Sequence, residues 1–180
     1  ATAFARGTLI PTVNGPVAIE DLMPGDYIVT AQGSAPVTWI GSTTFVPGRD
    51  DDMTTLTKLV RITAESRGLG RPAMDLLVGP TARMIVRHDK LKRLIGQSSV
   101  LAPVSDYADG DRVLAISPAG PVQLYHMMVR RHTTIDIGGI EMETYHPGKA
   151  VTQITGNNTR ALFLSLFQNI CVTVSDIFPA

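Results

Sequence analysis

Phe4-Ala5-Arg6-Gly7-Thr8-Leu9-Ile10 and Ile19-Glu20-Asp21-Leu22-Met23-Pro24-Gly25-Asp26 are the two stretches that decide the fold. Between them, Asn14-Gly15 separates Thr8-Leu9-Ile10 from Val17-Ala18-Ile19, and Asn-Gly between such segments is the strongest short signal of a β-hairpin. Pro24-Gly25-Asp26 has the composition of a turn, and a strand-like segment follows it at residues 27–30. The start of the chain therefore predicts short antiparallel strands joined by tight turns.

Further strand-forming segments follow along the rest of the chain. They lie at residues 37–40, 59–62, 76–78, 84–86, 112–116, 122–129, 133–137 and 140–145. Gly138-Gly139 joins the last two segments as a second hairpin turn. Because no long helical pattern separates these segments, the sequence predicts an all-β domain.

The composition is that of a folded domain. The chain has 180 residues, with 16 Lys and Arg against 16 Asp and Glu, and 44% of the residues are hydrophobic. The balanced charge does not indicate binding to nucleic acid or to an anionic membrane, which favour an excess of Lys and Arg. No apolar run approaches the ~18 residues of a membrane span. The single Cys excludes an intramolecular disulfide framework and a Cys-rich zinc site, and residues 1–6 do not have the pattern of a signal peptide.

The pattern changes after Pro147-Gly148. Residues 159–168 are rich in Ala, Leu and Phe, and Asn157-Asn158 precedes them as a candidate helix cap. We therefore expect a β-domain over residues 1–148 and a C-terminal helical appendage over residues 149–180, with a short helix at residues 159–168.

Three stretches carry a resemblance to a known family. The first is Phe-x-x-Gly-Thr from Phe4 with Glu-Asp-Leu-x-x-Gly-Asp from Glu20, the second covers residues 75–86, and the third runs from residue 125 to 148. Their order and spacing resemble the Hint (Hedgehog/intein) domains, in particular a bacterial Hint subfamily. The resemblance covers about residues 3–148 and implies the Hint fold, a disk of curved strands.

The resemblance implies autoprocessing of the domain's own N-terminal flanking polypeptide. Hint domains begin with a Cys or Ser that attacks the carbonyl of the preceding residue and converts the peptide bond into a thioester or ester, which a second nucleophile then resolves. An amide is a poor electrophile, so such a site must distort or polarise the bond and protonate the departing amine, usually through His. In the family, a Ser/Thr-Pro-x-His motif lies at the scissile amide.

Mapped onto this chain, the implied catalytic positions are Ala3, Gly79, Thr81, Ala82 and His132. Ala3 occupies the place of the nucleophile, and a methyl group cannot attack a carbonyl. The second motif reads Gly79-Pro80-Thr81-Ala82, so the hydroxyl and the imidazole are both missing. Thr81 lies two positions beyond Gly79 and would share its face if this segment were a strand.

Two explanations account for Ala3. An engineered Cys→Ala change would trap the precursor, whereas a naturally inactive sequence would also have lost the other two groups. On the first explanation the chain is an autoprocessing domain that is inactive as given. On the second it is a non-catalytic structural or interaction module with a Hint fold, and an unrelated β-barrel binding module is a third reading.

The histidines do not form a metal site. His132 lies in the third stretch, at a position where the family has a catalytic His. It is either a residual catalytic His or a partly buried His at a strand end. His126 alternates with apolar residues, which favours a packing role. The four scattered histidines lack metal-ligand spacing, and no cofactor motif is present. We expect Ala3 to lie inside the domain, with Phe4 and Leu9 buried, and no metal or cofactor.

Overall fold

The structure of the protein is a computed structural model that describes residues 2–47, 58–65, 69, 72, 74–87 and 98–145. Its strands are β1 (Phe4–Ala5), β2 (Leu9–Thr12), β3 (Gly15–Ala18), β4 (Tyr27–Thr30), β5 (Gly33–Phe45), β6 (Leu59–Ile62), β7 (Leu76–Val78), β8 (Arg83–Arg87), β9 (Ser99–Pro103), β10 (Val113–Ile116), β11 (Val122–Val129), β12 (Thr134–Ile137) and β13 (Ile140–Glu143). The helical elements within these ranges are the 3₁₀-helices Ile19–Asp21 and Val104–Tyr107. The all-β prediction is confirmed, while the predicted helix at residues 159–168 lies outside the described residues.

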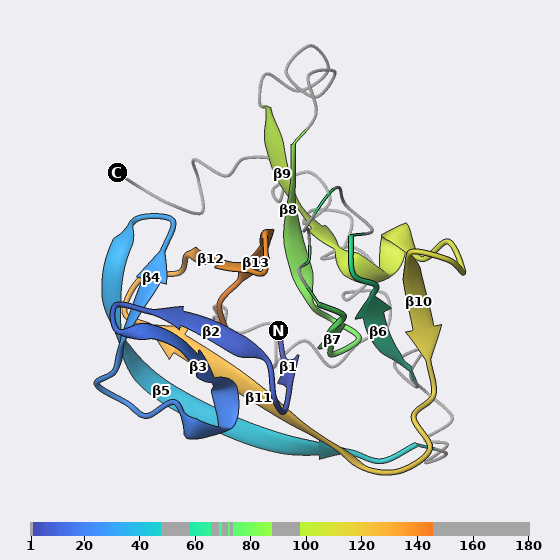
Figure 1. Ribbon diagram of the computed structural model, residues 1–180, viewed down its shortest axis with the longest axis horizontal. Helices are drawn as coiled ribbons and strands as arrows, with labels where there is room; N and C mark the ends of the chain where they lie inside the picture. The colour runs from blue at the N-terminus through green and yellow to red at the C-terminus, as the bar shows by residue number, and fades with distance from the viewer. Residues whose placement is uncertain are drawn as a thin grey trace, which may run out of the picture.

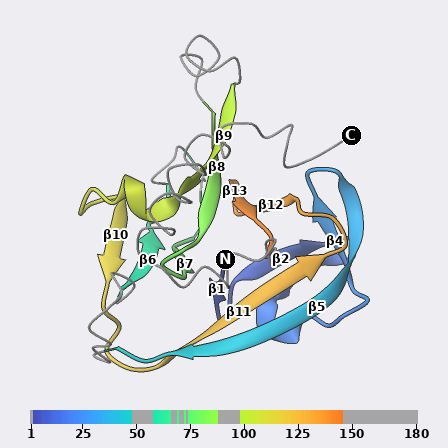
Figure 2. The same ribbon diagram turned by 180° about the vertical axis from the view of Figure 1, so that it is seen from behind.

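The strands form two antiparallel sheets. One has nine strands in the order β10-β6-β7-β1-β11-β5-β4-β2-β3, and the other has four in the order β12-β13-β8-β9. Figures 1 and 2 show β5 and β11 as two long curved strands that lie side by side. Their pairing runs from Phe45 opposite Val122 to Val37 opposite Val129, with a register shift after Met128. A bulge of this kind bends a strand, which fits the curvature of this ribbon.

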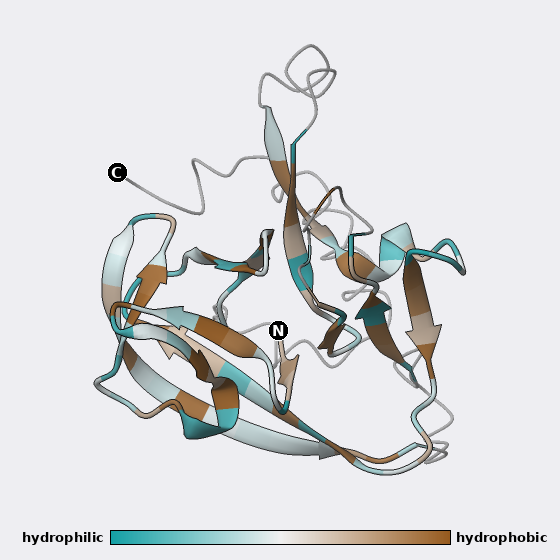
Figure 3. Ribbon diagram, viewed as in Figure 1, coloured by the Kyte–Doolittle hydropathy of each residue, from teal (hydrophilic) through white to brown (hydrophobic). Residues whose placement is uncertain are grey.

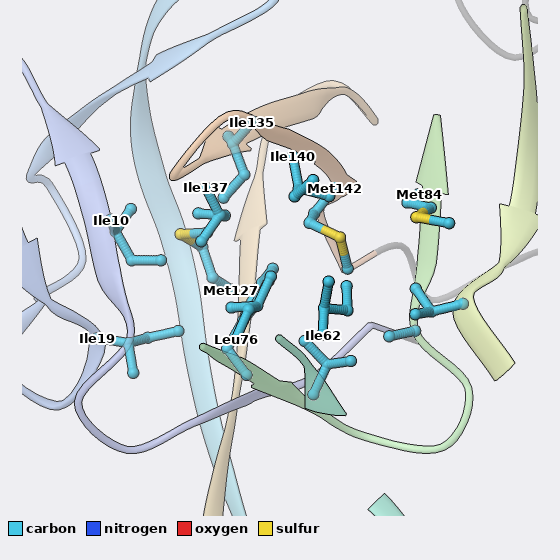
Figure 4. Packing of buried hydrophobic residues seen from close by; sticks show 14 of the residues in the cluster. Ile10, Ile19, Ile62, Leu76, Met84, Met127, Ile135, Ile137, Ile140 and Met142 are labelled. Atoms are coloured by element: carbon cyan, nitrogen blue, oxygen red, sulfur yellow. The ribbon is translucent and has the colours of Figure 1, made fainter. Parts of the chain in front are cut away.

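The core lies between the two sheets. Figure 4 shows isoleucine, leucine and methionine side chains from β2, β7, β8, β11, β12 and β13 that point toward one another. Ile10, Met127 and Met142 are fully buried there. Figure 3 shows apolar segments on strands of both sheets. The joint burial of these faces drives the sheets together, because apolar surface removed from water stabilises the fold by about 25 cal/mol per Å².

Several local predictions need correction. Leu9 is 43% exposed, because side chains alternate along β2 and Ile10 takes the inward position. The first hairpin turns at residues 13–14, and Gly15 pairs with Thr12 as the first residue of β3, with a φ of 102° that favours glycine. β1 and β9 are absent from the predicted strands, and β5 is much longer than the predicted segment 37–40.

Candidate functional site

The N-terminal segment enters the middle of the nine-stranded sheet. β1 is only two residues long, yet it lies between β7 and β11, with Phe4 opposite Val78 and Tyr125. Figures 1 and 2 show it near the centre of the molecule from both sides. Thr2 is 0% exposed and Ala3 is 3% exposed. The peptide bond between residues 2 and 3 is therefore enclosed, as the sequence analysis expects for Ala3 and Phe4.

The second motif forms a turn beside this bond. Gly79 donates its backbone N–H to the Ala3 carbonyl at 2.9 Å, and Ala82 donates its N–H to the Gly79 carbonyl at 3.2 Å. A Cβ atom added at Gly79 would lie 3.1 Å from the Ala3 Cβ, which is tighter than ordinary contact. Ala82 is buried, whereas Thr81 is exposed. Strand alternation does not apply within this turn, so Thr81 does not share the position of Gly79.

A histidine from β11 faces the same bond. The Nδ1 atom of His126 lies 3.1 Å from the Thr2 carbonyl oxygen. A carbonyl only accepts hydrogen bonds, so this contact requires a proton on Nδ1. Burial lowers the pKa of His126 below its ordinary value of 6.5, and the bond to Thr2 opposes this shift only in part. His126 is therefore neutral near pH 7 and polarises this carbonyl, a contact that the predicted packing role did not anticipate.

Aromatic rings cover His126. The Tyr145 ring meets it edge-on with 5.4 Å between centroids, and the Trp39 ring lies 5.1 Å from that of Tyr145. The residue paired with His126 on β5 is Gly41, where an added Cβ would lie 2.3 Å from an atom of the Trp39 ring. The ring of Trp39 thus occupies the space above Gly41, and the ring of Tyr145 lies between it and the imidazole.

Glu143 forms a second polar cluster around residue 2. Its carboxylate is 2% exposed and forms a two-point ion pair with Arg83, with 2.7 Å between Arg83 Nε and Glu143 Oε2. His132 Nε2 lies 2.7 Å from Oε1 of the same carboxylate. Burial acts to raise the pKa of Glu143, but His132 and Arg83 together outweigh it and hold this pKa below its ordinary range. Glu143 is thus an anion at neutral pH.

The sequence-predicted residues therefore fall into two groups. Gly79 contacts Ala3 at the enclosed peptide bond and Ala82 is buried in the same turn as Gly79, while Thr81 is on the surface and His132 contacts Glu143. The contacts of His126, Arg83 and Glu143 with residue 2 were not predicted from the sequence. The one available signal was a Glu at the end of an apolar strand, in a stretch already singled out for the resemblance.

Within the described ranges, no three His, Cys, Asp or Glu side chains group in a way that could hold a metal ion. The same part of the chain contains no helix long and apolar enough to cross a membrane. His88, His146 and Cys171 lie outside the described residues.

Comparison with known proteins gives a consistent family match. A family model described as the Hint domain matches residues 2–149. The chain is similar to a bacterial intein-like domain from Clostridium thermocellum, with a TM-score of 0.53 and 18% identity over 80% of this chain and 98% of that one. It is also similar to a splice-inactive variant of the AceL NrdHF class 3 split intein, with a TM-score of 0.53 and 11% identity over 80% and 98% of the two chains. No curated protein matches the chain.

Proposed function

The chain belongs to the Hint domain family, and on that premise we propose that it is an autoprocessing-type domain that holds the bond between Thr2 and Ala3 without cleaving it. Its partner is its own N-terminal flanking polypeptide, which enters the domain through residue 2. The observation that carries this proposal is the placement of Ala3, buried against Gly79 at the start of β1.

The first step of Hint chemistry needs three events at this bond. A nucleophile on residue 3 must attack the Thr2 carbonyl carbon, the C–N bond must break, and the nitrogen of residue 3 must take up a proton. The side chain of Ala3 is a methyl group, which has no lone pair to donate, so the new bond cannot form. Ala82 cannot supply the proton, and Gly79 has no hydroxyl for the scissile amide.

If this proposal is correct, two of the contacts that serve the reaction are still present. His126 donates a hydrogen bond to the carbonyl that would become an oxyanion, and donors of this type stabilise the transition state of acyl transfer. The Gly79 N–H fixes the next carbonyl, that of Ala3. The chain thus still binds the Thr2–Ala3 peptide bond and polarises the Thr2 carbonyl, but it lacks the nucleophile and the acid.

A second candidate function is a natural structural or interaction module. The residue types at the site favour it, because the nucleophile is missing at Ala3, the hydroxyl at Gly79 and the imidazole at Ala82, whereas one engineered change accounts only for the first. The codon at position 3 of the natural gene discriminates between the two: a Cys codon indicates an engineered trap, and an Ala codon indicates the natural module.

A reporter fused upstream of residue 1 tests the proposal directly. We expect the fusion to stay intact in dithiothreitol or hydroxylamine, because no thioester forms without a thiol at position 3. Intact-mass spectrometry detects any product, and an Ala3→Cys fusion treated in parallel shows whether the assay registers an acyl shift. Cleavage of the unaltered chain between Thr2 and Ala3 would refute the proposal.

A further inference from the structure

The side chain of Thr2 lies in a closed polar site that the proposed function does not use. Thr2 is 0% exposed. Its Oγ1 accepts a hydrogen bond from the backbone N–H of Arg83 at 3.2 Å and donates one to Glu143 Oε2 at 3.4 Å. Both bonds are long, and the same oxygen atom is the acceptor in one and the donor in the other. A hydroxyl is the neutral side-chain group that both donates and accepts there.

The groups around this hydroxyl are held in place from behind. Glu143 is almost fully buried, the Arg83 guanidinium bonds both of its oxygens, and the His132 Nε2 atom lies 2.7 Å from Oε1. Arg83 is the first residue of β8 and Glu143 is the last residue of β13, and these strands pair with each other. The acceptor and the donor that face Thr2 thus come from neighbouring strands of the same sheet. Such a prearranged pair loses little freedom on meeting a ligand group.

We propose that Arg83 and Glu143, with His132 as a positioning residue, form a recognition site for a small hydroxyl side chain, Ser or Thr, on the residue immediately before position 3. An apolar residue there would remove the acceptor of the part-buried Arg83 N–H, and a buried donor that loses its partner costs more than the bond itself is worth. An acidic residue would meet the buried charge of Glu143. The inference rests on the proposed function only in that residue 2 is taken as the end of the flanking polypeptide.

The site makes the domain selective for the side chain of the residue immediately before position 3. The Thr2 carbonyl is held by His126 and the Thr2 hydroxyl by the Arg83 and Glu143 pair, so the backbone and the side chain of one flanking residue are fixed separately. The carbonyl contact accepts any residue, because every residue has a carbonyl. The hydroxyl contact distinguishes Ser and Thr from the rest, since rejection is strongest where buried polar groups lose their partners.

Amide hydrogen exchange at Arg83, followed by NMR of the complete chain, tests this site. We expect slow exchange with Thr2 and with Thr2→Ser, and exchange faster by about three- to tenfold in Thr2→Val, which keeps the shape but removes the acceptor. Thr8→Val is the matched control, because the Thr8 hydroxyl bonds to the Ala5 carbonyl at 2.7 Å, outside this site. That control is expected to leave the Arg83 amide unchanged.

Two outcomes overturn the site: equal exchange in Thr2→Val and the unaltered chain, or equal acceleration in Thr2→Ser and Thr2→Val. If Thr2→Val does not fold, the same amide is followed in Thr2→Ala, which is smaller and also lacks the hydroxyl. The proposed function is judged separately by intact mass of the reporter fusion. A cleaved fusion would refute inertness without altering the comparison of exchange rates.

Discussion

The Nδ1 atom of His126 lies 3.1 Å from the carbonyl oxygen of Thr2, the oxygen on which charge develops in an acyl shift at the Thr2–Ala3 bond. β11 brings this histidine to the bond because it pairs directly with β1. The missing second-motif imidazole and His126 are therefore not equivalent. A His at position 82 would be an acid for the departing amine, whereas His126 contacts the carbonyl side of the same bond.

This division predicts a weak gain of chemistry from Ala3→Cys alone. We expect hydroxylamine to release a small fraction of a reporter at the bond between residues 2 and 3, because the carbonyl is polarised but the leaving amine has no acid. Adding His126→Ala should reduce that release by roughly 10²-fold, the usual cost of removing one oxyanion donor. Mass spectrometry of timed samples measures both rates.

His132→Ala in the Ala3→Cys background is the matched control, since its imidazole contacts Glu143 and not the carbonyl. Its effect is expected to be smaller than that of His126→Ala. The reverse order would contradict the role given to His126, and full activity of Ala3→Cys alone would show that no acid is missing and favour an engineered trap.

Restoring the whole motif should add activity and remove stability. We expect Ala3→Cys with Gly79→Ser and Ala82→His to cleave roughly 10²–10⁴-fold faster than Ala3→Cys alone, the usual value of general acid–base help. Ala82 is 1% exposed, so a His there overpacks the site and should cost about 1–3 kcal/mol in the free energy of unfolding. Reporter release and thermal unfolding measure the two effects on the same samples.

Ala3→Cys with Ala82→His alone separates the acid from the hydroxyl. If the three-residue variant is folded and still no faster than Ala3→Cys, positions 79 and 82 do not serve the junction, and the correspondence with the second motif is wrong. Adding His132→Ala to the three-residue variant then shows whether the Glu143 cluster contributes, and a lower rate is expected.

The pKa of His126 predicts how stability depends on pH. The folded protein depresses this pKa below 6.5, mainly through burial, so the unfolded chain binds a proton more readily. His126 therefore favours the folded state fully above about pH 6.5, and this contribution declines as the pH falls toward the folded-state pKa. The Tm of the unaltered chain should drop between pH 7.5 and 5.5 by more than that of His126→Gln, in which the amide can still donate to Thr2. Equal drops would show that His126 does not titrate in the expected sense.

The sequence allowed most of the strands to be predicted, because turns such as Gly138-Gly139 delimit them and the flanking residues have strand propensity. It did not allow the site to be assembled. The contacts of Thr2 with His126 and Glu143 join residues 124 and 141 positions apart, and they exist because β1 is inserted between β7 and β11. A two-residue strand has too few side chains for a periodic signal. The burial of Glu143 also does not follow from the alternation of inward and outward side chains along a strand, since its neighbour Met142 is buried as well.

The fit between Ala3 and Gly79 gives a final prediction about the packing of the site. Gly79→Ala would place a Cβ 3.1 Å from the Ala3 Cβ, and the two segments are tied by the bond from Gly79 N–H to the Ala3 carbonyl, so they cannot separate freely. We expect Gly79→Ala to lower the free energy of unfolding by about 1–3 kcal/mol, the usual cost of overpacking.

Ala3→Gly removes the opposing Cβ, so the double variant should recover part of that loss. The predicted coupling in a double-mutant cycle is about 0.5–3 kcal/mol, with the sign of relief, because the two residues are in contact. Urea unfolding of the four proteins measures it. Ala5→Gly is the control partner, since Ala5 is buried on β1 but is not among the atoms that an added Cβ at Gly79 would meet. A strong coupling means that the side chains at positions 3 and 79 pack directly against each other. Additive effects would instead show that the two segments move apart without loss of stability, and that the two positions do not constrain each other.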